Sequence, residues 1–143
     1  MKKLHEIRVK SDIFCSNINQ KIEESILYVE PKILDLTKSR LFNQQKDSFG
    51  NDMPEYSSKW KAIKGLTYWN LYQTGQLFNQ MFLSISRFVY TISSRSSHLR
   101  SLKSFWDYDF ENRFFAISEK DSPKAKQLSL KGFAAKYKSQ VLK

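Results

Sequence analysis

Acidic side chains form the first group of residues that could do chemistry in this chain. Asp107, Asp109 and Glu111 alternate, so on a β-strand they would share one face and could hold a divalent cation for hydrolysis. The other interpretation is a solvated connection whose acids attract nearby Arg and Lys side chains. We favour that interpretation because no histidine or lysine pattern accompanies the acids, which makes a metal-dependent nuclease the weakest of three hypotheses.

The remaining reactive side chains are isolated. His5 and His98 have no carboxylate or cysteine at ligand spacing, and Cys15, the only cysteine, has no histidine near it in the sequence. A single cysteine excludes an internal disulfide and a zinc site built from several thiolates. The four glycines are also isolated, so there is no phosphate-binding loop. We therefore predict no catalytic residue, no metal ligand and no cofactor, and expect that the protein is not an enzyme.

The composition is that of one folded domain. The chain has 143 residues, of which 41% are hydrophobic and 15% aromatic, and aromatic-rich chains of this size build one core. We interpret residues 1–143 as a single domain in which residues 1–15 are an N-terminal arm. No segment resembles a signal peptide, and no run approaches the ~20 apolar residues of a membrane helix. We expect no membrane partner and a reducing, cytosol-like environment.

The net charge of +10 is concentrated in the middle of the chain. Residues 57–106 carry seven Lys or Arg and no acid, whereas residues 11–56 carry eight acidic and five basic residues. Residues 119–143 add seven Lys against two acids. A fold that joined the two basic regions would present a positive face to nucleic acid or to an acidic protein. The residues predicted to contact DNA or an acidic partner are Lys59, Lys61, Lys64, Arg87, Arg95, Arg100 and Lys103.

Aromatic side chains are interleaved with these cations. The segment GLTYWNLYQTGQLF, residues 65–78, holds four aromatics and no charge. Such residues can stack on bases, although most aromatics of this kind lie in a core or an interface. Residues 47–65 have the composition of a long loop, and long loops often become ordered against a partner. We predict that this loop docks on neighbours, and the residues predicted for docking are Met53, Pro54, Tyr56, Trp60, Trp69 and Tyr72.

The elements that must position these residues begin with a long helix. Its apolar residues recur at steps of three and four, which places them on one helical stripe: Ile18, Ile22, Ile26, Val29, Ile33 and Leu36. Pro31 lies within the stripe, and proline removes a backbone donor and clashes with the preceding turn. The pattern predicts a helix over about residues 16–46 that is bent near Pro31.

The rest of the chain predicts a small sheet and a final helix. Residues 70–78 indicate a short helix or turn, and alternation over 81–85 and 90–92 indicates a hairpin that turns at Arg87 and Phe88. The segment RFFAIS, residues 113–118, reads as a third strand. Residues 97–110 fit either a short helix or a loop ending in a strand.

The C-terminal pattern is clearer. Ser122 can cap a helix, Pro123 suits its first turn, and apolar residues repeat to residue 141, so we predict a helix over about residues 123–142. The apolar residues of this repeat are Leu130, Phe133, Tyr137 and Val141. The expected fold is α+β, with a long kinked N-terminal helix, a small antiparallel or mixed sheet containing a hairpin, and a C-terminal helix.

Several short motifs follow one another along the chain: Phe42, Phe49-Gly50, Met53-Pro54, Tyr56, the lysines of residues 59–64, and then NLYQTGQLFNQMFLSI. Taken in this order, they resemble the phage virion morphogenesis or tail-completion proteins. That family has a leucine followed by Thr-Gly-x-Leu and a strand, and the corresponding residues here are Leu71, Thr74, Gly75, Leu77 and Ile85. RFFAIS is similar to the later strand that leads into the final helix, although the proline that the family often places before it is missing.

The resemblance implies a structural, non-enzymatic virion protein at the joint between a phage head and tail, in a neck or tail-completion ring. The partners it implies are copies of the same chain in a cyclic ring, the portal or connector, the tail proteins, and genomic DNA in the channel. The implied location is the virion, with the host cytoplasm during assembly. The alternative hypothesis is a small basic nucleic-acid-binding module.

Overall fold

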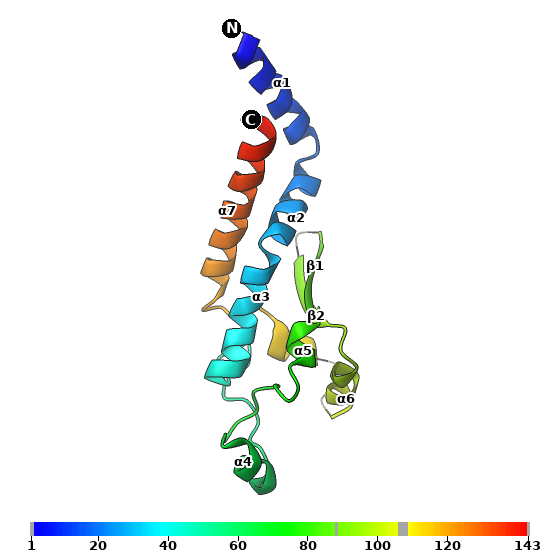
Figure 1. The fold of residues 1–143 in the computed structure, drawn as a ribbon, viewed down its shortest axis with the longest axis vertical. Coiled ribbons are helices and arrows are strands. Elements are labelled where there is room, and N and C mark those ends of the chain that lie inside the picture. Colours follow the sequence, from blue (N-terminus) through cyan, green and yellow to red (C-terminus); the bar gives the residue numbers. More distant parts are fainter. Residues whose placement is uncertain (1, 88, 106–108, 143) are drawn as a thin grey trace.

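The computed structural model describes residues 2–87, 89–105 and 109–142 (Figure 1). The fold is mixed α and β, with mostly helical elements and one small sheet. The elements before the sheet are α1 (Lys2–Ser16), α2 (Ile18–Tyr28), α3 (Glu30–Ser39), the π-helix η1 (Arg40–Gln44), α4 (Ser58–Lys64) and α5 (Gln76–Asn79). The later elements are β1 (Met81–Ser86), β2 (Val89–Ser94), α6 (Ser97–Phe105), the π-helix η2 (Glu111–Phe115) and α7 (Ser122–Val141).

The molecule is elongated along its helices. The successive helices α1, α2, α3 and η1 form one bent rod, and α7 lies beside this rod and returns toward α1 (Figure 1). Both chain ends therefore lie at the same end of the molecule, whereas α4 lies at the other end (Figure 1). One end of the molecule therefore consists of α1 and the end of α7, and the other part carries α4, α5 and α6.

The rod confirms the predicted kink and extends the predicted helix. It is interrupted at Asn17 and again at Val29, two residues before Pro31. The break at Val29 has a clear cause, because Pro31 cannot donate a hydrogen bond and its ring needs the preceding turn to open. Residues 1–15, interpreted as an arm, are helical from residue 2 onward as part of α1.

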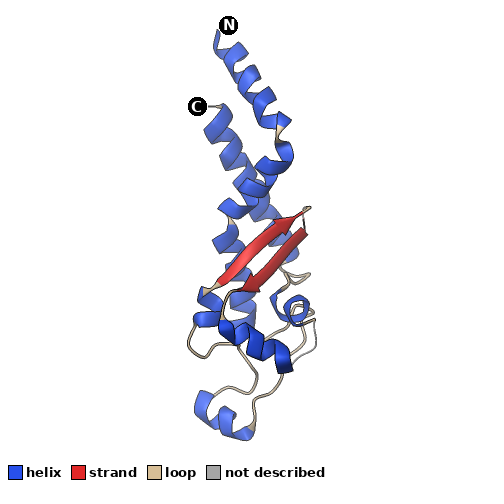
Figure 2. Cartoon of the chain, turned by 90° about the vertical axis from the view of Figure 1, so that its right-hand side faces the viewer, coloured by secondary structure: helices blue, strands red, loops and turns tan. Residues whose placement is uncertain are grey.

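The predicted hairpin is confirmed, and its two strands form the sheet in the part of the chain that the structure describes. Met81 lies opposite Ser94 and Ser86 lies opposite Val89, so the strands are antiparallel and joined at residues 87 and 88. Phe88 lies outside the described residues. Figure 2 shows the hairpin across one side of the helices, where Leu83 and Ile92 are buried. The Glu30 carboxylate of α3 accepts a hydrogen bond from the Leu83 backbone N–H of β1 at 2.8 Å, which links the hairpin to the helix.

The prediction of a third strand over residues 113–118 is wrong. This segment begins inside η2, and Phe114 and Phe115 are both completely buried. A strand would send these two neighbouring rings to opposite faces, whereas here both pack against Phe110, with ring centroids 4.7 and 5.6 Å away. The buried Arg40 guanidinium donates to the backbone carbonyls of Phe114 and Ala116 at 2.9 and 2.8 Å, which satisfies acceptors that a sheet would otherwise use.

Three other segments differ in detail from the sequence-based expectations. The loop of residues 47–65 contains a helix, α4. The ambiguous segment of residues 97–110 is helical in α6, and residues 106–108 lie outside the described part. The C-terminal helix is confirmed, but its N-cap position is Asp121 and Ser122 is its first residue. Within its predicted stripe Val141 is 1% exposed, whereas Leu130 is 63% exposed.

The main core lies where the rod, the hairpin and η2 meet. The stripe of the N-terminal helix supplies Ile26, Val29 and Ile33, as its spacing predicted. Residues far along the chain complete the core, namely Leu77, Phe78, Met81, Leu83, Ile92, Leu99, Phe110, Phe114 and Phe115. None of the residues of α1 belongs to this core, and α1 is held separately by Phe14, which packs edge-on against Phe133 and Tyr137 of α7.

Candidate functional site

Four of the six residues predicted for docking line one open pocket at the α4 end of the molecule. These residues are Tyr56, Trp60, Trp69 and Tyr72. The pocket has a volume of about 260 Å³, and its walls come from α4, from residues 69–77 and from α6. Trp60 and Tyr72 are each 41% exposed, so their rings are accessible to a partner. We call this site the aromatic pocket.

The pocket is built on two short extended segments that pair with each other. The Tyr56 N–H donates to the Thr67 carbonyl at 2.9 Å, and the Trp69 N–H donates to the Pro54 carbonyl at 2.8 Å. This pairing joins the two ends of the segment that carries α4. It places the centroids of the Tyr56 and Trp69 rings 6.2 Å apart. The aromatic walls are thus set by backbone hydrogen bonds rather than by a flexible loop.

A buried amide fixes the other wall of the pocket. The Asn70 side-chain oxygen accepts hydrogen bonds from the Tyr56 hydroxyl and the Tyr72 N–H, both at 3.1 Å, and Asn70 is 4% exposed. Burial raises the pKa of the Tyr56 hydroxyl above its ordinary value, and the contact with Asn70 opposes this shift. Gly75 has a φ of 78°, and a Cβ there would lie 3.2 Å from the Tyr72 hydroxyl oxygen. The uncharged segment 65–78 therefore forms the pocket wall on one side and core on the other.

The other two residues predicted for docking lie away from the surface of the pocket. Met53 is 2% exposed and belongs to the core, so its assignment as a docking residue is wrong for this fold. Pro54 is partly buried, and its carbonyl takes part in the pairing beneath the pocket. The sequence did not reveal the contribution of α6, which lines the pocket with His98, Ser101 and Leu102.

The predicted cationic residues fall into three groups. Lys59, Lys61 and Lys64 lie on α4. Lys61 pairs with Glu55 at 2.5 Å, and Lys64 lines the pocket and donates to the Tyr72 carbonyl. Lys59 is exposed. Of the three α4 cations, Lys64 alone is a lining residue of the aromatic pocket.

The remaining predicted cations lie along the hairpin and α6. Arg95 lies over the Phe82 ring at 4.9 Å, Lys103 pairs with Glu111 at 2.5 Å, and Arg100 is exposed on α6. Arg87 lies in the hairpin turn with a φ of 49°. The turn is five residues along β1, or about 17 Å, from the other end of the hairpin. Arg87 is therefore distant from the cations near the pocket.

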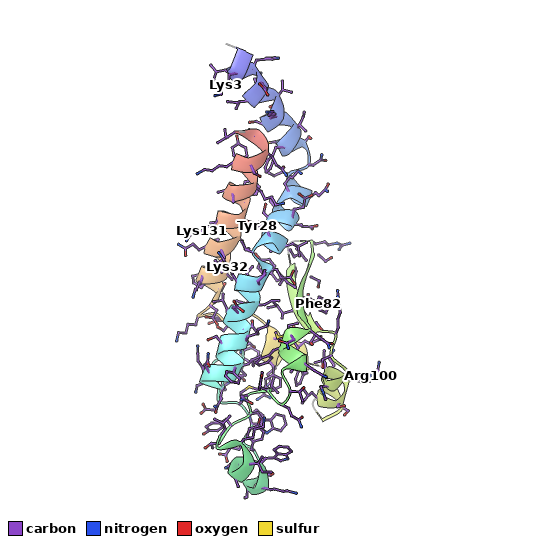
Figure 3. The ribbon with its side chains drawn as sticks, viewed as in Figure 1. Lys3, Tyr28, Lys32, Phe82, Arg100 and Lys131 are labelled. Carbon is purple, nitrogen blue, oxygen red and sulfur yellow. The ribbon has the colours of Figure 1, made fainter. Side chains whose placement is uncertain are left out.

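The fold does not merge the two basic regions of the sequence into one face. The lysines of residues 119–143 follow α7, beside the rod, whereas the middle block lies on α4, the hairpin and α6 (Figure 1). Figure 3 shows Lys131 of α7 and Arg100 of α6 projecting on opposite sides of the molecule. Among the described residues, the two basic regions therefore lie on different parts of the fold.

Among the acids that suggested a metal site, Glu111 is bound by other side chains of the protein. Asp107 lies outside the described residues, and Glu111 lies in a π-helix rather than a strand. Burial alone would raise the pKa of Glu111, but hydrogen bonds from Lys103 and Ser93, together with the Lys103 charge, lower it below its ordinary value. Among the residues that the structure describes, no cluster of His, Cys, Asp or Glu could hold a metal ion.

Further exposed apolar side chains lie at the opposite end of the molecule. Leu4, Val9 and Ile13 on α1 are 74%, 42% and 63% exposed, and Leu142, just after α7, is 52% exposed. The spacing of the three α1 residues distributes them around the helix rather than along one face. We call these four residues together the α1 surface. Sequence reasoning treated residues 1–15 as an arm and identified none of the four.

Comparisons of the chain with protein-family models, with curated proteins and with solved structures found no match. Across the described ranges, none of the helices is both long enough and apolar enough to cross a membrane.

Proposed function

We propose that this chain is a structural, non-enzymatic subunit of a phage head–tail joint, a ring protein that links the portal or connector to the tail. The proposal rests on the sequence resemblance together with the distribution of exposed surface over the molecule. The surface argument is independent of the resemblance.

The observation that carries the proposal is an excess of accessible surface. The isolated chain of 16.9 kDa exposes 9814 Å². A compact monomer of this mass exposes about 7,700 Å², so the excess is about 2,100 Å². One side of a standard protein interface buries about 800 Å². The excess therefore equals two to three such sides, as expected of a subunit that is covered by several neighbours.

Exposed apolar residues lie at both ends of the long axis, and others, such as Tyr28 on α2 and Leu130 on α7, lie between the ends. The aromatic pocket lies at the α4 end, and the α1 surface lies at the end that carries both termini (Figure 1). A subunit that joins two layers of an assembly needs separate contact surfaces of this kind, because each end meets a different partner. Within one layer, a cyclic ring needs a further pair of unlike surfaces on each copy.

The test is mass spectrometry of gradient-purified virus particles from the source culture. We expect this chain to co-purify at a fixed copy number, relative to the major capsid protein, in the range of one ring. Trp60→Ala should lower its incorporation because Trp60 is an exposed wall of the aromatic pocket, whereas Lys131→Ala on α7 should incorporate normally. Absence of the wild-type chain from particles would refute the proposal.

The alternative is a small nucleic-acid-binding module, and one observation favours it. Lys59 and Arg100 are exposed on the two helices, α4 and α6, that flank a pocket with accessible aromatic rings. Cations for phosphates and rings for bases are the two components of single-strand binding sites. This function predicts binding of a single-stranded oligonucleotide that weakens steeply as the salt concentration rises. The logarithm of the binding constant should fall linearly with the logarithm of the salt concentration, with a slope set by the number of phosphates neutralised. Binding that is insensitive to salt would refute it.

A further inference from the structure

Phe49 is the most exposed aromatic side chain among the described residues, and the surrounding turn is well ordered by hydrogen bonds. Phe49 is 70% exposed. The carboxylate of Asp47, which is 1% exposed, accepts hydrogen bonds from the N–H groups of Phe49 and Asn51 at 3.0 and 2.8 Å. Gly50 supplies the positive φ of 87° that closes the turn. A bulky ring held out on a preorganised turn loses little entropy on binding, which is the property of an interface anchor.

The base of this turn is tied to the body of the protein. The Ser48 N–H donates to the Arg113 carbonyl, and the Ser48 hydroxyl donates to the Asn112 carbonyl, both at 2.8 Å. The turn is therefore anchored on η2, on a surface separate from the α4 and α6 walls of the aromatic pocket. Phe49 does not occupy the pocket of its own chain.

The aromatic pocket has the size and chemistry to receive one such anchor. Its volume of about 260 Å³ lies below the ~300–1,000 Å³ of typical small-molecule sites. Its walls are the rings of Tyr56, Trp60, Trp69 and Tyr72, and aromatic pairs gain stability beyond area burial through edge-on and offset contacts. A single ring entering from outside would find partners on several sides.

The pocket side carries cations that are not paired within the described part of the chain. Residues 57–106, which supply most of the pocket, contain seven cations and no acid. Among the described residues, neither Lys59 nor Arg100 has a carboxylate partner. On the Phe49 side, the Asp52 carboxylate pairs with Lys46 of its own chain but is still 52% exposed. Cations beside the pocket and an exposed carboxylate near the anchor would steer the encounter of the two surfaces.

We propose that Phe49 of one copy inserts into the aromatic pocket of the next copy. This inference rests on the proposed ring function and identifies the contact between neighbouring subunits. The contact joins two different surfaces, so it is heterologous and leads to a closed ring when the rotation per copy closes. Each copy then donates one Phe49 and accepts another.

Two complementary variants isolate a single contact of this kind. Phe49→Ala keeps the pocket and removes the anchor, whereas Ser101→Phe fills the pocket from an exposed position on α6 and keeps the anchor. Neither variant can assemble with itself through this contact, because each lacks either the anchor or the open pocket. A mixture can form one contact between one copy of each variant. Uniformly ¹⁵N-labelled Phe49→Ala is titrated with unlabelled Ser101→Phe, and the indole N–H signals of Trp60 and Trp69 are followed by NMR.

We expect both indole signals to shift and to saturate as Ser101→Phe is added. The matched control titrant is the double variant F49A/S101F, which should shift them at least ten-fold less at the same concentration. A second control, L4A/S101F, removes a side chain that is 74% exposed on α1 and should retain the full shift. If Ser101→Phe does not fold, Gln73→Trp fills the same pocket from another exposed position.

Three outcomes would overturn the contact. The first is no indole shift at millimolar Ser101→Phe, and the second is an equal shift with the double variant. The third is a shift produced by single-stranded oligothymidylate but not by Ser101→Phe, which would assign the pocket to nucleic acid. The particle count is a separate measurement. A ring-like copy number without an indole shift removes this contact alone, and a shift without virion incorporation removes the head–tail function alone.

Discussion

At the scale of single residues, Glu111 shows how a carboxylate that suggested metal chemistry serves the fold. Its oxygens accept hydrogen bonds from Lys103 of α6 and Ser93 of β2, which lowers its pKa below the ordinary value of 4.5. Glu111→Gln should lower the free energy of unfolding at pH 7 by roughly 0.5–1 kcal/mol, because the ion pair is partly exposed. Urea unfolding at a series of pH values measures this difference.

The pH dependence of that difference has a defined sign. A carboxyl group whose pKa is lowered by folding stabilises the protein above its unfolded pKa, and the contribution disappears as the pH falls through the folded pKa. The difference in the free energy of unfolding between wild type and Glu111→Gln should therefore have its full value above about pH 4.5 and disappear at lower pH. Glu119→Gln, at an exposed position, is the control. A gap that stays constant down to pH 2 would contradict this role.

At the scale of elements, the packing of α7 on α2 depends on Gly132. A Cβ at this position would lie 2.5 Å from the Ser25 carbonyl oxygen and 3.0 Å from the Val29 Cγ1 atom. Helix propensity alone favours alanine over glycine by about 1 kcal/mol, but separating two packed helices costs about 1–3 kcal/mol. We expect Gly132→Ala to lower the free energy of unfolding, as measured by urea denaturation.

An exposed position on the same helix provides the comparison. Ala134 is exposed on α7, so Ala134→Gly should lower stability by about 1 kcal/mol through propensity alone. If Gly132→Ala instead raised stability by a similar amount, the close approach of α2 and α7 would not restrict residue 132.

At the scale of the whole molecule, α1 is attached to the rest of the protein through one small cluster. Phe14 is 3% exposed and packs on Phe133 and Tyr137 at 5.5 and 5.3 Å, and the main core contains no residue of α1. Phe14→Ala should therefore increase hydrogen exchange in α1 while α3 and β1 keep their protection. Equal loss of protection across all helices would show that the chain unfolds as one unit.

Much of the architecture was predictable from local patterns. The spacing of Ile26, Val29 and Ile33 identified the buried stripe, and Pro31 located the kink to within two residues. Strict alternation identified the hairpin, because its two faces have different environments. The segment RFFAIS misled because a short apolar run fits a strand as well as any other buried segment.

What the sequence by itself determined is the set of local preferences: a kinked amphipathic helix, a hairpin, a C-terminal helix, a cationic middle block and an uncharged aromatic segment. The tertiary structure alone decided which distant residues meet. It buried Met53 and Arg40, paired Glu111 of η2 with Lys103, kept the two basic regions apart, and joined α4 to α6 around one aromatic pocket. These contacts join residues far apart in the sequence, and their energies come from burial and long-range hydrogen bonds that no local pattern encodes.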